Sequence, residues 1–249
     1  MKFSVFQTSQ IGGRKKNEDR MGYSYSKAAA VFVVADGLGG HPAGDMAAQL
    51  GLQIVMSKFR EQAKPTIPKV RNFIHEVMMA VHQSLVTYAM TNAMPDTPST
   101  TLVMAIIQDC RLYLGHCGDS RMYLIRQAEI LMRTQDHSLL MRDGGVFAES
   151  EIETQGRHTL FSCLGAASAP FIELADPVTL EFGDRLLFCS DGLWGSVQES
   201  EILQYMQHSK VADGATALVQ LALRNGGPRG DNVTAVAVNW EEPDNRALT

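Results

Sequence analysis

The apolar and polar positions of this chain follow a period of two in some stretches and a helical period in others. The run from Val31 to Ala35 is apolar at every position, which is typical of a strand buried on both faces, and Asp36 and Gly37 end it. Alternating or continuous apolar residues predict further strands at residues 3–8, 21–26, 100–107, 111–117, 121–126, 177–181, 186–190 and 233–239.

Helical spacing of apolar residues predicts two pairs of neighbouring helices. The expected ranges are 43–60, Pro68 to about Thr91, 198–208 and 213–224.

Turns and glycines set the remaining expectations. Short turns at 108–109 and 118–120 predict that the three strands between 100 and 126 are antiparallel neighbours. Glycines and charges weaken the pattern over 136–165, so we expect a mobile excursion there.

Length and charge limit the possible functions. A chain of 249 residues with 45% hydrophobic content can bury one sizeable core. No linker or repeat divides it, so we expect a single domain over 1–240 and a disordered tail over 241–249. A net charge of −5 argues against nucleic acid as a partner. The compact basic cluster Arg14-Lys15-Lys16 suffices for one phosphate but not for a duplex.

Cysteine usage indicates a reducing compartment. The four cysteines show no CxxC spacing, which argues against a zinc site or a disulfide framework and favours a cytoplasmic protein. No apolar stretch has the length of a signal peptide or of a membrane span, so we expect no membrane partner.

Five aspartates fall next to the ends of predicted strands. In an antiparallel sheet, the end of one strand and the start of its neighbour lie at the same edge, so these carboxylates are expected to converge. Carboxylates gathered so closely raise one another's pKa values and need arginines or cations. Taken alone, each is also typical of a turn or a helix N-cap. The residues are Asp19, Asp36, Asp119, Asp191 and Asp231.

A ligand set made of oxygen atoms favours Mg²⁺ or Mn²⁺. The carbonyl of Gly37 is a further oxygen beside the carboxylate of Asp36. Two such ions about 3.5–4 Å apart acidify a shared water and clamp a phosphoryl group. Arg14, five residues before Asp19, adds a fixed fork for two phosphate oxygens.

Seven short motifs follow one another along the chain: RKKNED (14–19), VADGLGGHPAGDMAA (34–48), STTLV (99–103), GHCGDSR (115–121), QDHSLL (135–140), CSDGLW (189–194) and GDNVTAVAV (230–238). Each motif is weak alone, but their order and separations are specific. Over residues 12–239 the chain resembles the metal-dependent serine/threonine protein phosphatases of type 2C, in their compact bacterial form.

The resemblance implies an α+β fold, a four-layer α/β/β/α sandwich of two antiparallel sheets flanked by helix pairs. It also implies metal-dependent hydrolysis of phosphoserine or phosphothreonine in proteins, by direct attack of a water that bridges two metal ions.

Matching motif positions imply a role for each aspartate. Asp36 bridges the two ions, with the Gly37 carbonyl on one of them. Asp191 and Asp231 hold the other ion. Asp19 binds metal directly or through water.

A looser third ion and the substrate phosphate complete the implied site. Asp119 helps to hold the third ion, and Arg14 takes the phosphate. Numerous members carry an acidic residue where this chain has Gly195, which leaves the third ion short of a ligand. Many eukaryotic members place a histidine, proposed as the acid for the leaving oxygen, where this chain has Leu38. The nearest candidate is His41, for which a structural hydrogen bond is an equal alternative.

Two further segments carry expectations from the resemblance. His137 of the QDHS motif is expected to be buried and hydrogen-bonded. Residues 143–158 fall where the family has its flap beside the active site.

An active phosphatase would act on phosphorylated proteins opposite a serine/threonine kinase, and we expect a monomer. The alternative is a catalytically silent module of the same fold that binds a phosphorylated partner. It predicts the loss of a metal-binding aspartate, and none is lost. A two-metal nuclease or small-molecule phosphatase is disfavoured by the acidic net charge and the lack of an aromatic-basic groove.

Overall fold

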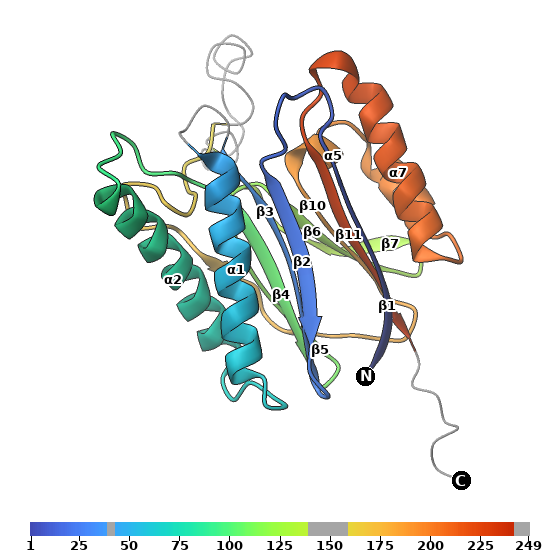
Figure 1. The fold of residues 1–249 in the computed structure, drawn as a ribbon. Coiled ribbons are helices and arrows are strands. Elements are labelled where there is room, and N and C mark those ends of the chain that lie inside the picture. The colour runs from blue at the N-terminus through green and yellow to red at the C-terminus, as the bar shows by residue number, and fades with distance from the viewer. Residues whose placement is uncertain (39–42, 139–158, 242–249) are drawn as a thin grey trace.

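The computed structural model describes residues 1–38, 43–138 and 159–241. Two antiparallel sheets face each other, and helices cover the outer side of each sheet (Figure 1). The predicted four-layer α+β arrangement is confirmed.

The first sheet has the strand order β1-β11-β10-β6-β7. These strands are β1 (Lys2–Gln10), β11 (Val233–Glu241), β10 (Arg185–Cys189), β6 (Arg121–Arg126) and β7 (Glu129–Arg133).

The second sheet has the order β2-β3-β4-β5-β8, with β9 also paired to β5. These strands are β2 (Asp19–Tyr25), β3 (Ala29–Asp36), β4 (Leu102–Gln108), β5 (Arg111–Cys117), β8 (Glu173–Leu174) and β9 (Val178–Thr179).

The helices fall into two groups, one for each sheet. Against the second sheet lie α1 (Gly44–Gln62) and α2 (Val70–Thr91). Against the first sheet lie α5 (Asp191–Trp194), α6 (Glu199–Met206) and α7 (Val211–Gly226), which leads into the 3-10 turn η1 (Gly227–Arg229).

Strand β3 shows how the sequence builds two cores at once. Its odd-numbered apolar residues, such as Val31 and Val33, pack toward α1 and α2. Its even-numbered residues point between the sheets, where Phe32 stacks on Phe188 of β10 with ring centroids 5.9 Å apart. Burying a side chain of this size contributes about 1.5–3 kcal/mol. The apolar run is therefore buried on both faces, as predicted, and the core fixes where β3 ends at Asp36.

The prediction that strands 111–117 and 121–126 are antiparallel neighbours is wrong. β5 pairs with β4, whereas β6 pairs with β10 and β7 in the other sheet. Residues 118–120 therefore cross from one sheet to the other and do not form a hairpin turn. Gly118 has a φ of +104°, and a Cβ there would lie 2.6 Å from the side chain of Thr101, so the crossing requires glycine.

Smaller differences concern the edges of the fold. β7 has no counterpart among the predicted strands, and the strand expected at 177–181 shortens to the two residues of β9. Glu241 is the last residue of β11 and pairs with Lys2, so the predicted tail starts too early. Residues 242–249 lie outside the described part.

The expected excursion at 136–165 is described only at its ends, where Ser138 forms a β-bridge with Leu160. In the described ranges, no helix combines the length and the apolar character needed to cross a membrane.

Candidate active site

Two glycines place Arg14 beside Asp231. Gly12 and Gly13 lie in the loop between β1 and β2, against the loop that precedes β11. A Cβ on Gly12 would lie 2.0 Å from the carbonyl oxygen of Asp231, and its φ of +61° also favours glycine. The N–H of Gly13 donates to the carbonyl of Gly230 at 2.9 Å. With the loop fixed in this way, Nη2 of Arg14 donates to Oδ2 of Asp231 at 2.5 Å.

Asp19 and Asp36 are register partners on β2 and β3. Thr101, just before β4, holds the backbone of Asp36. Its N–H donates to the Asp36 carbonyl at 2.8 Å, and its Oγ1 accepts from the Asp36 N–H at 3.1 Å. The same Oγ1 lies 2.7 Å from Oγ of Ser120. Thr101 therefore ties Asp36 to the connection that carries Asp119.

Asp191 and Asp231 are supplied by the first sheet. Asp191 opens α5 after β10, and Asp231 lies two residues before β11. Ser190 links this sheet to the other one, because its Oγ donates to Oδ2 of Asp19 at 2.7 Å and accepts from the Thr234 N–H at 3.1 Å. The two sheets are thus joined by a hydrogen bond to the carboxylate of Asp19.

Asn232 holds the loop that carries Arg14. Its Oδ1 accepts from the Glu18 N–H at 2.8 Å, and its Nδ2 donates to the carbonyls of Ile11 and Lys16 at 2.8 and 3.0 Å. This buried amide therefore uses both of its ends to fix the loop.

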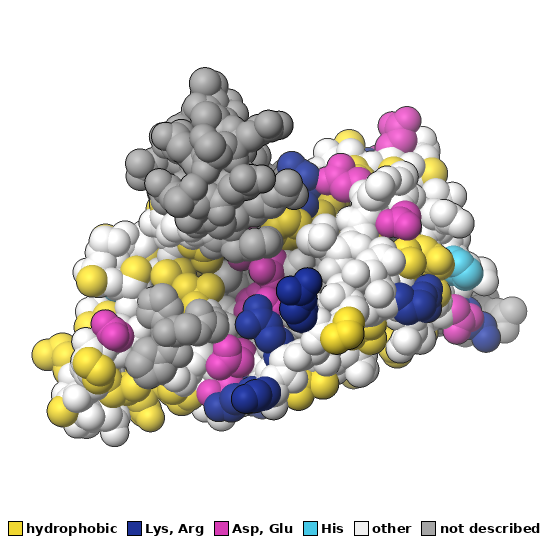
Figure 2. Space-filling view, turned by 90° about the horizontal axis from the view of Figure 1, so that it is seen from above, with side chains coloured by type: hydrophobic (Ala, Val, Ile, Leu, Met, Phe, Trp, Pro, Cys, Tyr) yellow, Lys and Arg dark blue, Asp and Glu magenta, His cyan; other side chains and the backbone are white. Residues whose placement is uncertain are grey.

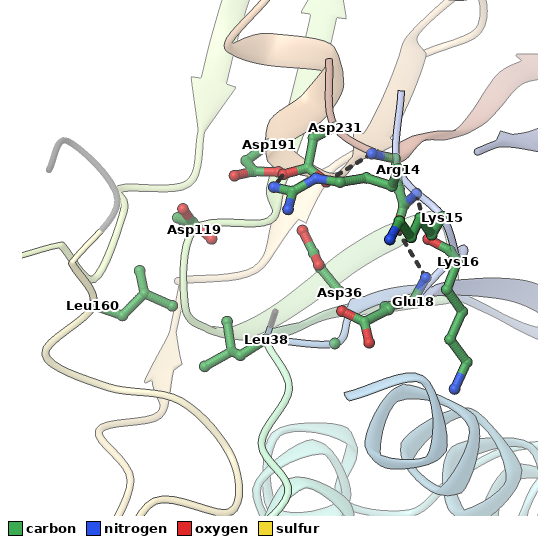
Figure 3. A pocket seen from close by; sticks show the side chains of 12 residues that line it. Arg14, Lys15, Lys16, Glu18, Asp36, Leu38, Asp119, Leu160, Asp191 and Asp231 are labelled. Carbon is green, nitrogen blue, oxygen red and sulfur yellow. Dashed lines mark hydrogen bonds and ion pairs between the residues drawn. The ribbon is translucent and has the colours of Figure 1, made fainter. Parts of the chain in front are cut away.

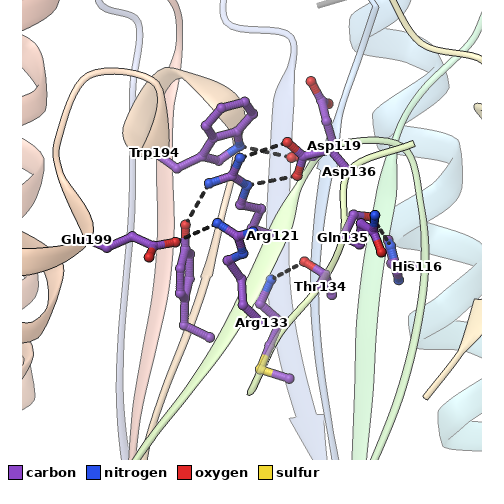
Figure 4. A network of polar contacts seen from close by, with 11 residues as sticks. His116, Asp119, Arg121, Arg133, Thr134, Gln135, Asp136, Trp194 and Glu199 are labelled. Atoms are coloured by element: carbon purple, nitrogen blue, oxygen red, sulfur yellow. Dashed lines mark hydrogen bonds and ion pairs between the residues drawn. The ribbon is translucent and has the colours of Figure 1, made fainter. Parts of the chain in front are cut away.

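The connection that carries Asp119 is held from two sides. The N–H of His137 donates to the Gly118 carbonyl at 3.0 Å, and its Nδ1 accepts from the Gly118 N–H at 3.2 Å. Nε1 of Trp194, in α5, donates to the carbonyl of Asp119 at 2.9 Å (Figure 4). The buried, hydrogen-bonded role predicted for His137 is confirmed.

Arg121 supports the indole of Trp194. Its guanidinium carbon lies 3.6 Å from the centre of the Trp194 ring system. Its Nε and Nη2 donate to the two carboxylate oxygens of Asp136 at 2.8 and 2.7 Å. The side chains of Arg121 and Asp136 are only 13% and 10% exposed, so solvent screens this fork little. The ring that contacts Asp119 is held in one orientation as a result.

A cavity of about 380 Å³ collects these groups (Figure 3). Arg14, Lys15 and Lys16 stand on one side of it, and Leu38 and Leu160 stand on another. Its acidic lining residues are Glu18, Asp36, Asp119, Asp191 and Asp231. Asp19 is buried beside Asp36 as its register partner.

The surroundings of Asp36 and Asp19 disfavour the charged form of each carboxylate. Burial and then the charges of Asp19 and Asp191 raise the pKa of Asp36 well above its ordinary value. Burial also raises the pKa of Asp19, whose Oδ1 is buried without a hydrogen-bond partner in the described part of the chain. Divalent cations would relieve both penalties. Because the ligand atoms that these aspartates and the Gly37 carbonyl offer are oxygens, the residues fit Mg²⁺ or Mn²⁺.

A family model described as Protein phosphatase 2C matches residues 6–224. This range is most of the chain and contains Arg14 and four of the five aspartates. The chain belongs to the protein phosphatase 2C family.

Bacterial members of the family are similar to this protein phosphatase 2C over its length. The serine/threonine phosphatase stp of Listeria monocytogenes is 29% identical over 239 residues, which cover 94% of each protein. The serine/threonine protein phosphatase PstP of Mycobacterium tuberculosis is 32% identical over 238 residues, which cover 93% of this chain and 43% of PstP.

Solved structures of bacterial serine/threonine phosphatases are also similar to this chain. The crystal structure of the serine/threonine phosphatase Stp1 from Staphylococcus aureus matches with a TM-score of 0.85 and 29% identity, covering 97% of this chain and 96% of that one. The catalytic domain of PstP in complex with two manganese ions matches with a TM-score of 0.79 and 30% identity, covering 96% of this chain and 99% of that one.

The phosphatase fold brings the predicted aspartates together, but for a different reason from the one expected. They do not share the edge of a single sheet, because Asp19 and Asp36 come from the second sheet and Asp191 and Asp231 from the first. Asp119 lies on the crossing between the two. His41 and the segment 143–158 lie outside the described residues.

The backbone of Gly37 has a role that the sequence does not reveal. A Cβ on Gly37 would lie 2.2 Å from the carbonyl oxygen of Gly44, the first residue of α1. Glycine is therefore required for the close approach of α1, besides leaving a carbonyl beside Asp36.

Asn232, Ser190 and Thr101 were not predicted as site residues. Each stands inside a motif, and Asn232 and Ser190 are direct neighbours of Asp231 and Asp191 in the sequence, which was the available signal. Their side chains are short and polar, and such residues are also common in ordinary turns.

A second group of possible metal ligands lies outside this cavity. Ligand atoms of His116, His137 and Glu173 lie within 4.8 Å of one another. Nδ1 of His137 accepts from the Gly118 N–H, so the neutral ring carries its proton on Nε2, which faces Glu173 at 3.5 Å. Burial, followed by the charge of His116, lowers the pKa of His137 to about 3. A protonated Nε2 is not a metal ligand, so this cluster is structural.

Proposed function

We propose that this protein hydrolyses phosphoserine and phosphothreonine in phosphorylated proteins, with Mn²⁺ or Mg²⁺ as cofactor. The observation that carries this proposal is the convergence of Arg14 with four of the five predicted aspartates in one cavity. The names of the bacterial relatives support the reaction, and the two manganese ions of the PstP complex support the cofactor.

Two central ions would be held by Asp36, the Gly37 carbonyl, Asp191 and Asp231, with Asp19 as a direct or water-mediated ligand. When bound, such ions would acidify a water and clamp the phosphoryl group. The raised pKa of Asp36 fits this role, because a cation at that point stabilises the charged form that the protein alone disfavours.

Arg14 would bind the phosphate of the substrate. Its guanidinium has five N–H donors, and the described hydrogen bond to Asp231 uses one of them. The side chain is 53% exposed, so a phosphate can approach the remaining donors. The fork then orients the phosphoryl group above the carboxylates, which is a binding role and not a proton transfer.

The remaining assignments are extensions of the same proposal. Asp119 and Asp191 would hold a weaker third ion. His41 would protonate the leaving oxygen of serine or threonine, and its replacement by alanine should slow peptide substrates more than aryl phosphates, which have a better leaving group.

The test is hydrolysis of a phosphothreonine peptide and an aryl phosphate, with manganese and with chelator. We expect turnover of both substrates with manganese and none with chelator. A catalytically silent binding module would bind the peptide without turnover in either condition. No observation favours that alternative, because every expected aspartate is present.

A single catalytic domain over 1–240, a monomeric state, an opposing serine/threonine kinase and a cytoplasmic location stay predictions from the sequence. Sedimentation of the purified chain and limited proteolysis would test the first two.

A further inference from the structure

The rim of the cavity carries a charge opposite to that of the molecule. The chain has a net charge of −5, yet three consecutive cations, Arg14, Lys15 and Lys16, line one side of the cavity. Figure 2 shows lysine and arginine side chains gathered beside acidic ones at the centre of the face that is seen from above. We refer to these three residues as the basic rim.

Two members of the basic rim are already paired with carboxylates of the protein. Arg14 donates to Asp231, and Nζ of Lys16 lies 2.6 Å from Oδ1 of Asp45. Lys15 is exposed and forms no ion pair with any residue that the structure describes. Lys15 is therefore the rim residue whose charge no described carboxylate neutralises.

The two sides of the cavity differ in chemistry. Lys15 stands beside Arg14, whereas Leu38 and Leu160 stand away from them across the cavity (Figure 3). A phosphorylated residue that reaches Arg14 and Asp36 must enter between these sides. In an extended peptide, neighbouring residues follow at about 3.3–3.6 Å per residue. The positions next to the phosphorylated residue then lie between Lys15 on one side and Leu38 and Leu160 on the other.

Building on the proposed phosphatase function, we propose that Lys15 is a substrate-recognition residue that contacts an acidic group beside the phosphorylated residue. The preferred substrates are then phosphopeptides with aspartate, glutamate or a second phosphate at a flanking position. A lysine suits this role because its ammonium group is a compact charge on a flexible stem, which can follow a carboxylate at more than one position.

The experiment compares phosphothreonine peptides that differ only at the flanking positions. One peptide carries glutamate before the phosphothreonine, one carries glutamate after it, and one carries alanine at both places. A fourth and a fifth carry lysine before or after it. The enzymes are the wild type, Lys15→Ala, Lys15→Glu and Lys27→Ala. Lys27 is an exposed lysine that lines a different pocket, so Lys27→Ala matches the loss of charge without touching the rim.

We expect the wild type to prefer one of the glutamate peptides over the alanine peptide by about two- to fivefold in kcat/KM, the range of an exposed ion pair. The difference should lie in KM and shrink at high salt. Lys15→Ala should bring the ratio close to one, Lys15→Glu should favour lysine at that same position, and Lys27→Ala should keep the wild-type ratio.

A wild-type enzyme that treats all five peptides alike, or a Lys15→Glu variant that keeps the wild-type preference, would overturn the assignment of Lys15. Failure of the proposed function has a different signature, since the wild type with manganese would then hydrolyse neither the peptides nor an aryl phosphate.

Discussion

Asp119 at the base of the cavity is 5% exposed, whereas the side chain of Lys16 on the basic rim is 61% exposed. We call the five aspartates, Asp19, Asp36, Asp119, Asp191 and Asp231, the carboxylate floor. Neutral groups of Ser190, Thr101 and Trp194 fix the floor through hydrogen bonds from both sheets. The rim is held by its backbone, and the side chains of Arg14 and Lys16 are 53% and 61% exposed although each pairs with a carboxylate.

The difference follows from what each region must do. Like charges in one place repel, so they keep a defined geometry only where the surrounding structure is rigid enough to hold them. The rim meets substrates of varied sequence, and flexible cations can adapt to them. Changes in the floor should therefore alter catalysis, metal binding and stability together, whereas changes in the rim should alter substrate binding alone.

The largest expected effect comes from Asp36→Asn. This variant should have no measurable phosphatase activity, yet it should unfold at a higher temperature than the wild type in chelator. The reason is that the metal-free wild type holds a carboxylate whose pKa is raised by burial and by its neighbours. We expect a gain of at least about 1 kcal/mol, or about 2–4 °C in melting temperature for a chain of this size.

The pH dependence of that gain has a defined sign. The folded pKa of Asp36 is raised, so above the unfolded value near 4 the folded state binds more protons and loses stability as pH rises. The stability advantage of Asp36→Asn should thus be small at pH 4 and grow toward neutral pH. Melting curves of both proteins in chelator across this pH range measure the advantage. An advantage that shrinks with rising pH would contradict the raised pKa of Asp36.

The next effect in size comes from the rim. Arg14→Ala should raise KM much more than it lowers kcat, because a phosphate clamp binds the ground state and the transition state alike. A charge-assisted contact is worth about 1.5–3 kcal/mol, so kcat/KM should fall by about 10- to 150-fold. Steady-state kinetics measure this, with Arg14→Lys as the variant that keeps charge but loses the fork. An unchanged KM in Arg14→Ala would remove the residue from phosphate binding.

A smaller change should follow from Trp194→Phe, which loses the hydrogen bond to the Asp119 carbonyl but keeps a ring beside Arg121. We expect about 1 kcal/mol lower stability and a shift of the high-metal phase of manganese activation to higher concentration, with KM unchanged. Trp240→Phe is the matched control, because Nε1 of Trp240 is buried and has no hydrogen-bond partner among the residues that the structure describes. An equal metal shift in both variants would show that Asp119 is not positioned by Trp194.

The smallest effect is expected from Gly195→Asp. If Asp119 and Asp191 hold the third ion with few other ligands, an added carboxylate should move the second activation phase to lower manganese concentration. The φ of Gly195 is −73°, which any residue adopts, but a Cβ there would lie 2.8 Å from the Asp191 carbonyl oxygen. Gly195→Ala therefore controls for the steric cost in thermal melts. A manganese titration that overlays the wild-type curve would contradict the third-ion hypothesis.

Much of the floor was predictable because its residues follow strong local patterns. The apolar run that ends at Asp36 and the strand that ends before Asp191 are both clear in the sequence, and both lead to a DG pair. Strand ends marked in this way place carboxylates reliably, whichever sheet the strand joins.

Sheet membership was not predictable from the same patterns. The turn 118–120 has the length of a hairpin. Nothing local shows that β6 leaves the sheet of β5 to pair with β10, whose residues lie 60 to 68 positions from their partners in β6. β7 lies at a sheet edge and has several exposed positions, so its alternation of apolar and polar residues is weak. The linking roles of Ser190 and Thr101 depend on contacts between distant segments, so they require the assembled fold.

The most direct test of the central claim is a count of bound manganese made on the samples whose hydrolysis of a phosphothreonine peptide is measured. We predict that the wild type binds at least two ions per chain and that activity appears only as these sites fill. Asp36→Asn should remain folded but lack both the central ions and the activity. Full turnover by wild-type protein that holds no metal would contradict the central claim.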